Sequence, residues 1–263
     1  MRAAVRDPYE AMERARERWS EWYDRRVGCE QPSLSADWER LLHLHLDQPW
    51  PCTASLEFSA MFDQVTTSLS KTGLEIGRGA YGGWDDGDAA LARAVWCAAR
   101  HMKPQDVVET GVARGITSRF VLEALEINGA GRLWSVDIAP LLEPGLRRET
   151  GVAVPARLRH RWRYLEGSSR KRLPVLLDVL GNLDLFIHDS MHTTRNVAFE
   201  LKTAWEVLRP GGVMIVDDVD KNSAFAGFAR THPDDLVLAG PADDERATIG
   251  IAFKTASVEP ERR

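Results

Sequence analysis

Short apolar runs alternate with longer periodic segments along the chain from about residue 104 onward. This alternation is typical of βαβ units in a mostly parallel sheet. The predicted strands cover residues 106–110, 132–137, 162–166, 184–188, 213–216, 236–239 and 248–254. The predicted helices between them cover residues 117–125, 173–180 and 195–208, and the sequence Arg209-Pro210-Gly211-Gly212 ends the last of these. We therefore expect an α/β fold with a doubly wound, mostly parallel, seven-stranded sheet.

Helical periodicity without strands marks the first part of the chain. Residues 8–25 combine an aromatic stripe with a charged face, and residues 38–46 and 60–69 also have helical patterns. The stripe consists of Tyr9, Met12, Trp19, Trp22 and Tyr23. We interpret residues 1–80 as an α-helical N-terminal lid whose stripe packs on its own domain, with a dimer surface as the alternative. Self-association through these helices is part of this hypothesis.

A glycine-rich segment over residues 77–87 joins this lid to the rest of the chain. Its glycine content argues against a regular element, so we expect a flexible loop. Asp88 is predicted to N-cap a helix over residues 89–100. We assign residues 81–256 to the main domain and residues 257–263 to a frayed tail.

Composition and charge narrow the range of partners. The chain has 263 residues, 44% apolar and 28% charged, as expected for a globular domain with a helical extension. Its net charge of −5 and its pI near 5.8 give no overall attraction to nucleic acid or to an anionic membrane. We therefore expect a small-molecule partner, with no nucleic acid and no membrane.

The N-terminus and the cysteines suggest a location. The N-terminus lacks an apolar signal region, and no apolar run approaches the roughly 18 residues of a membrane span. Cys29, Cys52 and Cys97 are odd in number, widely separated and without CxxC spacing. This pattern favours neither a disulfide framework nor a thiolate zinc site. We expect a cytoplasmic protein.

A glycine-rich turn and a later acid predict a cofactor site. Gly111 and Gly115 follow the first predicted strand, with Glu109 just before them and Thr117 at the start of the next helix. Asp137 ends the second strand, at a spacing suited to binding ribose hydroxyls. The GxxxG spacing, with an acid that would repel a diphosphate but could hold an ammonium group, favours a cationic, phosphate-free cofactor over NAD. The alternative is a tight turn that binds no ligand.

Acidic and histidine residues follow the fourth and fifth strands, which end at the same edge of a parallel sheet. Asp189, Asp217 and Asp218 should converge there, and an oxygen-ligated Mg²⁺ or Mn²⁺ would relieve their repulsion. Such an ion lowers the pKa of an alcohol, and His192 is the candidate base, with Asp189 beside it. His188 is predicted to be a hydrogen-bonded histidine of the core or of the pocket wall. Helix caps are the alternative for the single acids, and a histidine-containing zinc or iron site is a further alternative for the cluster.

The first motif resembles that of class I S-adenosylmethionine-dependent methyltransferases, which have the form ExGxxxG followed by an acid at the end of the second strand. The resemblance implies a Rossmann-like methyltransferase fold in which Gly111 and Gly115 line the cofactor. It further implies that Glu109 lies near the methionine end and that Asp137 binds the ribose.

Four more residues are assigned to the cofactor. Gly167 and Ser168 are similar to the family segment that borders the adenine. Thr117 opens the helix after the first motif, and Tyr81 lies in the glycine-rich loop that could fold over the cofactor.

The acid and histidine cluster resembles that of metal-dependent O-methyltransferases, especially the macrocin O-methyltransferase-like enzymes that methylate sugar hydroxyls. Catechol-type enzymes are similar but usually have a lysine at the position of His192. The resemblance covers about residues 81–254 and implies Mg²⁺-assisted methylation of a hydroxyl on a sugar or related natural product. Cephalosporin hydroxylase-like proteins share this frame. The alternatives are an NAD-dependent oxidoreductase and a non-catalytic scaffold that binds the cofactor.

Overall fold

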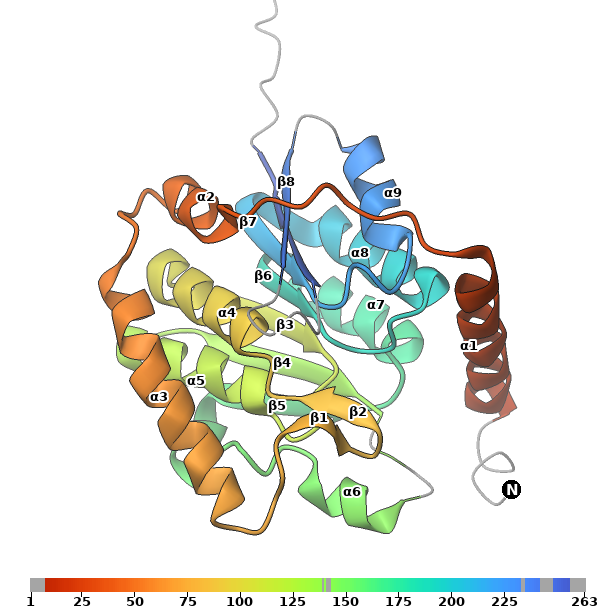
Figure 1. Cartoon of the computed structure of the whole chain (residues 1–263), viewed down its shortest axis with the longest axis horizontal. Helices are drawn as coiled ribbons and strands as arrows, with labels where there is room; N and C mark the ends of the chain where they lie inside the picture. Colours follow the sequence, from red (N-terminus) through yellow and green to blue (C-terminus); the bar gives the residue numbers. More distant parts are fainter. Residues whose placement is uncertain (1–7, 139, 141–142, 233–234, 242–247, 256–263) are drawn as a thin grey trace, which may run out of the picture.

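A seven-stranded sheet forms the centre of the molecule (Figure 1). The structure, a computed structural model, describes residues 8–138, 140, 143–232, 235–241 and 248–255. The strand order is β5-β4-β3-β6-β7-β9-β8, with β9 antiparallel to both of its neighbours and the other pairs parallel. The strands are β3 (Asp106–Thr110), β4 (Arg132–Asp137), β5 (Trp162–Glu166), β6 (Leu183–His188), β7 (Leu208–Val216), β8 (Leu236–Pro241) and β9 (Thr248–Phe253). The predicted seven-stranded, mostly parallel sheet is confirmed.

The side of the sheet to which successive strands are added changes between β3 and β6. From β3 the chain adds β4 and β5 on one side, and it then returns to add β6 and β7 on the other. Strands β3 and β6 are direct neighbours, with Thr110 opposite His188 at their ends. Loops that leave the carboxyl ends of two such strands diverge, so that a crevice opens between them.

Helices cover both faces of the sheet (Figure 1). Strand residues alternate between two hydrophobic clusters, so that Val107 packs in one and Val108 in the other. The helices of the first cluster are α3 (Thr53–Ser70), α4 (Ala89–Met102) and α5 (Ile116–Asn128). Those of the second are α7 (Ser169–Leu180), α8 (Thr194–Val207) and α9 (Ala224–Thr231). The two helical layers hold the strand ends in fixed positions.

A β-hairpin occupies the glycine-rich segment for which we predicted a flexible loop. It consists of β1 (Gly77–Tyr81) and β2 (Trp84–Asp86). Gly82 and Gly83 form its turn with φ angles of +59° and +92°, the combination that a type I′ turn requires. The prediction was wrong because paired glycines allow a tight turn as readily as they allow disorder.

Short elements complete the fold. Asp88 N-caps α4, as predicted, by accepting hydrogen bonds from the backbone of Ala90 and Leu91. The sequence pattern missed α6 (Pro144–Glu149), η1 (Ala156–Arg161) and α9, which are six to eight residues long and show too little periodicity.

The second and third helices belong to the main core. Trp38 and Leu42 on α2 (Trp38–His45) and Phe58 on α3 are buried in the same hydrophobic cluster as Val107. They cover the sheet as an integral layer. The boundary at residue 80 that the sequence suggested therefore runs through a continuous core, although the role of this segment as a lid stays a prediction.

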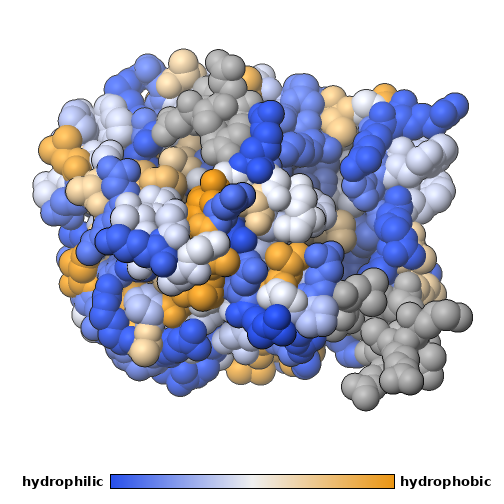
Figure 2. Space-filling model, turned by 60° about the horizontal axis from the view of Figure 1, so that its bottom comes forward, coloured by the Kyte–Doolittle hydropathy of each residue, from blue (hydrophilic) through white to orange (hydrophobic). Residues whose placement is uncertain are grey.

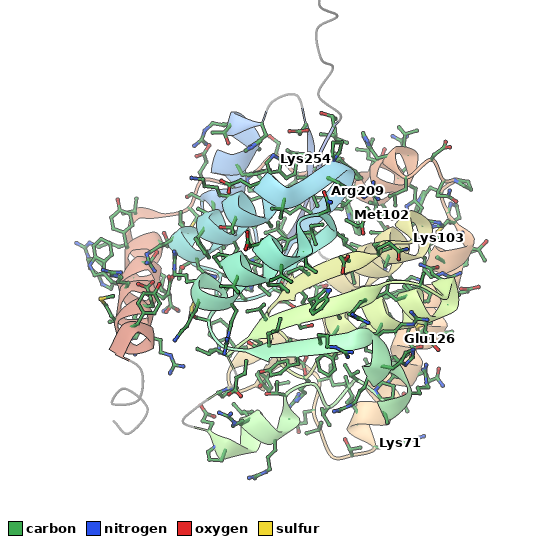
Figure 3. All side chains as sticks on the ribbon, turned by 180° about the vertical axis from the view of Figure 1, so that it is seen from behind. Lys71, Met102, Lys103, Glu126, Arg209 and Lys254 are labelled. Carbon is green, nitrogen blue, oxygen red and sulfur yellow. The ribbon has the colours of Figure 1, made fainter. Side chains whose placement is uncertain are left out.

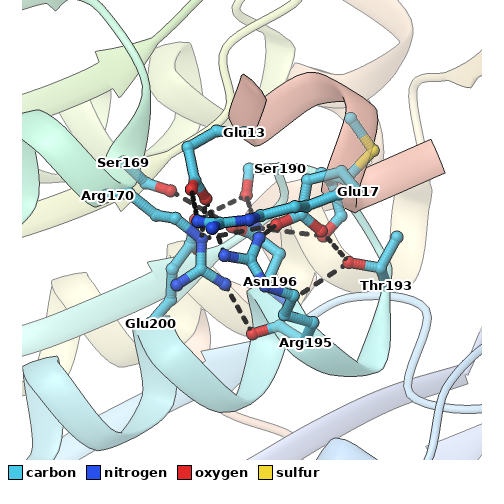
Figure 4. A network of polar contacts seen from close by, with 11 residues as sticks. Glu13, Glu17, Ser169, Arg170, Ser190, Thr193, Arg195, Asn196 and Glu200 are labelled. Atoms are coloured by element: carbon cyan, nitrogen blue, oxygen red, sulfur yellow. Dashed lines mark hydrogen bonds and ion pairs between the residues drawn. The ribbon is translucent and has the colours of Figure 1, made fainter. Parts of the chain in front are cut away.

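The first helix, α1 (Pro8–Val27), attaches through its polar side. Its aromatic stripe faces outward, with Trp19 64% and Trp22 54% exposed, which corrects the expectation that the stripe packs on its own domain. Glu17 instead accepts a hydrogen bond from Thr193 and pairs with Arg170 and Arg195 (Figure 4). Charged contacts with the start of α8 and with α7 thus hold this helix.

The face of the molecule seen in Figure 2 is mostly polar. Hydrophilic residues cover much of the face in Figure 2, with hydrophobic residues scattered between them. None of the helices in the described part of the chain is long and apolar enough to cross a membrane. The predicted tail at residues 257–263 lies outside the described residues.

We expect Glu17→Ala to loosen α1, because Arg170 and Arg195 lose a shared partner. The loss of charge-assisted hydrogen bonds of this kind costs about 1–3 kcal/mol, and tryptic cleavage at the arginines of α1 should become about 10-fold faster. Glu21→Ala is the control, because Glu21 pairs within the helix with Arg25. Equal cleavage rates in both variants would contradict this attachment.

Candidate functional site

A cavity of ≈ 1080 Å³ lies at the carboxyl edge of the sheet. Its lining comes from the loops after β3, β4, β5, β6 and β7, from the hairpin and from the polar side of α1. Seen from behind, Lys103, Arg209 and Lys254 lie at the other end of the strands, away from α1 (Figure 3). The cavity therefore occupies the crevice that the strand order predicts.

The glycine loop after β3 touches the loop after β6. Gly111 has a φ of +85°, and a Cβ atom on it would lie 1.8 Å from the carbonyl oxygen of Asp189. The backbone N–H of Asp189 donates to the carbonyl of Thr110 at 2.8 Å. Only glycine fits at this position, because both the space and the left-handed backbone exclude a side chain.

The other predicted loop residues divide between the cavity and the packing behind it. Thr117 lines the cavity, and its hydroxyl lies 3.5 Å from Oδ2 of Asp189. Gly115 has a φ of +80°, and a Cβ atom on it would lie 3.1 Å from Cα of Gly151. Its close approach is thus to another backbone segment.

The ends of β4 and β5 supply the next part of the wall. Asp137 lines the cavity and accepts a hydrogen bond from the N–H of Ile138 at 2.8 Å. Burial raises the pKa of Asp137 to about 6, against the opposing effect of the N–H groups of Ile138 and Ala113. Gly167 and Ser168 lie beside it, since the N–H of Gly167 donates to the carbonyl of Asp137.

Glu109 lies beneath the glycine loop and outside the cavity lining, which differs from its predicted position in the crevice. It is fully buried, and its Oε2 accepts hydrogen bonds from the hydroxyls of Ser118 and Ser135, both at 2.6 Å. The alternation of β3 turns this side chain toward α5. Burial raises the pKa of Glu109 to about 8.

Asp189, His192 and Asp217 converge at the ends of β6 and β7. One ligand atom from each lies within 4.8 Å of the others. Burial raises the pKa of Asp189 to about 7, and burial together with the charges of Asp218 and Asp189 raises that of Asp217 well above its usual value. Oδ1 of Asp217 and Nε2 of His192 are buried without a hydrogen-bond partner among the described residues. The cluster therefore brings together metal-ligand atoms whose hydrogen-bonding capacity is unused by the described residues.

Asp218 lies beside the group of Asp189, His192 and Asp217. Its Oδ2 lies 2.6 Å from Nδ1 of His192 and 3.0 Å from Nζ of Lys221. Burial opposes ionisation of this carboxyl, but the contacts with His192 and Lys221 lower its pKa overall. The closest group of donor atoms therefore contains His192 in place of Asp218, because a φ of +52° turns Asp218 toward the imidazole.

A second buried network supports the loop after β6. Nδ1 of His188 lies 2.7 Å from Oε2 of Glu200, which also accepts a hydrogen bond from Thr110. Burial opposes the charge on Glu200, but His188 and the hydroxyl donors lower its pKa to about 2. Ser190 donates to the other oxygen of Glu200, which ties the loop to α8 (Figure 4). His188 is thus a hydrogen-bonded histidine of the core, one of the two positions that we predicted.

Sequence reasoning missed Arg114, which lies inside the glycine loop. Its side chain is 4% exposed. It pairs with Asp86 of the hairpin and Glu149 of α6, and it donates to the carbonyl of Ala80. Tyr81, whose hydroxyl lies 3.3 Å from the carbonyl of Leu146, lines the cavity beside it. A charged residue between two glycines was the available signal, but its partners are distant in sequence.

Residues 108–219 match a family described as "Methyltransferase domain". An O-methyltransferase structure from Klebsiella pneumoniae aligns with a TM-score of 0.54 at 18% identity, covering 74% of this chain and 90% of that chain. One from Bacillus cereus, in complex with SAH, aligns with a TM-score of 0.51 at 15% identity, covering 81% and 97%. One from Streptomyces achromogenes, involved in tomaymycin synthesis and in complex with SAM, aligns with a TM-score of 0.50 at 16% identity, covering 74% and 89%. No curated protein matches the chain significantly.

These likenesses establish the fold. Residues 108–219 match the methyltransferase-domain family, and the chain has the Rossmann-like architecture that the sequence motif indicated.

We expect Gly111→Ala to unfold at a markedly lower temperature and to lose most of the ligand affinity of the cavity. The new methyl group would meet the Asp189 carbonyl, so that the two loops must separate. Gly129→Ala is a matched control, because Gly129 has a φ of +73° but a Cβ atom on it would meet nothing within 4 Å. Thermal unfolding of both variants separates the clash from backbone strain, and equal losses would contradict the loop contact.

The raised pKa of Glu109 predicts a pH-dependent effect of Glu109→Gln. The folded protein keeps a proton that the unfolded chain releases above its usual pKa of 4.5, so this group destabilises the fold as the pH rises from there to about 8. Relative to the unchanged protein, the variant should gain roughly 3–5 kcal/mol of unfolding free energy between pH 5 and pH 8.

Denaturant unfolding at both pH values measures this difference. Glu126→Gln is the control, because Glu126 is an exposed carboxylate on α5 whose pKa is lowered, chiefly by Arg161. A difference for Glu109→Gln that does not change with pH would contradict the buried, protonated state.

Proposed function

We propose that the methyltransferase domain over residues 108–219 is the core of an S-adenosylmethionine-dependent O-methyltransferase. Its acceptor would be a hydroxyl of a sugar or related natural product, and Mg²⁺ or Mn²⁺ would assist the transfer. The observation that carries this proposal is the adjacency of two different sets of groups in one cavity: the glycine loop with Asp137, and the cluster of Asp189, His192 and Asp217.

The first set suits the cofactor. With a pKa of about 6, Asp137 is mostly ionised at neutral pH and can accept hydrogen bonds from both hydroxyls of a ribose. Gly167 and Ser168 beside it would border the adenine, and Gly111 and Thr117 would border the methionine part. Tyr81 would close the pocket from the hairpin side. Glu109 and Gly115 would position the loop from below, without touching the cofactor.

The second set suits a divalent cation. Asp189 and Asp217 supply carboxylate oxygens, and the raised pKa values and the unpartnered Oδ1 of Asp217 fit a site that binds positive charge. Asp218 would act mainly through His192. A cation at this position would lower the pKa of the acceptor hydroxyl and neutralise the two carboxylates.

His192 is the proposed base. Asp218 fixes Nδ1, so that Nε2 remains directed at the cluster, 3.9 Å from Oδ1 of Asp189. Nε2 would take the proton of the acceptor hydroxyl while its oxygen bonds to the methyl carbon and the carbon–sulfur bond of the sulfonium breaks. The products are a methyl ether and S-adenosylhomocysteine. A positioned base of this kind contributes about 10²- to 10⁴-fold in rate.

Polar side chains of α1, including Arg14, Arg18 and Glu21, line the side of the cavity nearest this helix. They support a polar, hydroxylated acceptor over an apolar one. Self-association through the N-terminal helices stays a prediction, which the outward aromatic stripe of α1 supports.

Calorimetric titration and a transfer assay test this function. We expect S-adenosylhomocysteine to bind and NAD not to bind, with about 10-fold weaker binding for Asp137→Asn because one hydroxyl loses its charged acceptor. With labelled S-adenosylmethionine and a panel of hydroxylated sugars, Asp217→Asn should lower methyl transfer at least about 100-fold and leave S-adenosylhomocysteine binding unchanged.

Asp178→Asn, a change at an exposed acid on α7, should leave both measurements unchanged. Transfer that persists after complete removal of divalent ions would contradict the metal role. Tight binding of NAD alone would contradict the cofactor assignment.

A further inference from the structure

Two histidines and two cysteines gather where α2, α3 and α4 meet. His43 lies on α2, Cys52 is the N-cap of α3, and Cys97 and His101 lie on α4. None of the four belongs to the cavity lining. The pair His43 and Cys52 is distant in sequence from the pair Cys97 and His101, and without CxxC spacing the sequence did not indicate the cluster.

The donor atoms of these side chains point at one another. Nε2 of His43 and Nε2 of His101 each lie 3.1 Å from Sγ of Cys52. Ligand atoms of His43, Cys52 and Cys97 all lie within 4.8 Å of one another. Cys97 and His101 are four residues apart on one helix, so they share a face. His43, Cys52 and Cys97 thus form one close group of nitrogen and sulfur donors, and His101 approaches this group at Sγ of Cys52.

A neighbouring carbonyl group orients one of the histidines for metal binding. Nδ1 of His43 lies 2.7 Å from the carbonyl oxygen of Glu39, so Nδ1 carries the proton and the Nε2 lone pair faces the cysteines. A carbonyl that orients a histidine in this way is a common feature of metal sites.

Burial and charge favour a soft divalent ion. His43, Cys52 and Cys97 are each 2% exposed or less, so an ion at their centre would be shielded from water. Two thiolates, two neutral imidazoles and one divalent ion sum to zero charge, which keeps the cost of burial low. Sulfur and nitrogen donors in fourfold sets are typical of structural zinc, whereas magnesium prefers oxygen.

We propose that His43, Cys52, Cys97 and His101 bind one Zn²⁺ in a closed structural site that fastens α2 and α3 to α4. The site uses all four ligand positions and leaves none for a substrate. It is separate from the acidic cluster in donor chemistry and in position.

A metal-free explanation exists for the same contacts. Cys52 also caps α3 by accepting a hydrogen bond from the N–H of Ser55 at 3.2 Å, and thiol–imidazole hydrogen bonds could account for the distances to the two histidines. In that case the protein would bind no zinc here. The two explanations differ in metal content and in thiolate ligation, which can both be measured.

The test uses the full chain, purified without chelators. Elemental analysis should give about one zinc per chain. Replacement by Co²⁺ should produce a thiolate-to-cobalt charge-transfer band in the near ultraviolet and the visible bands of a tetrahedral ion, and neither readout requires an assay of activity. Cys97→Ser should lose most of the charge-transfer band and bind zinc at least about 100-fold more weakly.

Two control variants locate the signal. Cys29→Ser removes a cysteine far from the cluster, where Cys29 contacts Lys221, and should keep the band. Asp217→Asn changes the acidic cluster and should also keep it. If Cys97→Ser fails to fold, His101→Gln provides the same comparison, because His101 is only half-buried and its replacement leaves both thiols in place.

The outcomes are distinct. Zinc that remains below about 0.1 per chain after reconstitution, with no charge-transfer band, would overturn the proposal. Equal spectra for Cys97→Ser and Cys29→Ser would also overturn it. A band that is lost in Cys97→Ser and kept in both controls would support it, together with a lower unfolding temperature when zinc is removed from the unchanged protein.

Discussion

The contact between Gly111 and Asp189 is the constraint on which the rest of the site depends. Because β3 and β6 are parallel neighbours, the loops that follow them leave the sheet side by side. A Cβ atom at position 111 would lie 1.8 Å from the Asp189 carbonyl, so the two loops meet backbone to backbone. The proposed cofactor loop and the acidic cluster thereby become two sides of one junction.

Two buried glutamates support this junction from opposite helical layers, and they do so in opposite charge states. Burial alone would raise the pKa of both. Glu109 has two neutral hydroxyl donors, which are too weak to offset burial, and its pKa rises to about 8. Glu200 also contacts His188, and its pKa falls to about 2. The hydrogen-bond partner thus decides whether the pKa of the buried glutamate rises or falls. A neutral acid therefore lies under the glycine loop, while an ionised one holds the acid-bearing loop.

The sequence pattern predicted the features that follow from the order and periodicity of residues along the chain. The seven strands, the N-cap at Asp88 and the adjacency of the strand-end acids all follow from periodicity and topology. Side-chain direction did not follow in the same way: the grouping of His192 with Asp189 and Asp217 depends on the backbone twist at Asp218. Arg114 escaped notice because its partners come from separate segments. The orientation of α1 was wrong because amphipathicity identifies two faces but does not say which one a charged neighbour will attract.

The N-terminal segment is attached in two physically different ways, and the difference bears on access to the cavity. Trp38, Leu42 and Phe58 bury apolar side chains, each worth about 1.5–3 kcal/mol, so α2 and α3 are held firmly. The contacts of α1 are mainly ion pairs, and Arg195 remains 32% exposed, so that salt weakens its pair with Glu17. Since α1 lines the cavity, the most weakly held helix of the extension is also the one beside the site. Salt therefore weakens the attachment of the helix beside the cavity, while the hydrophobic core that positions the strand ends stays intact.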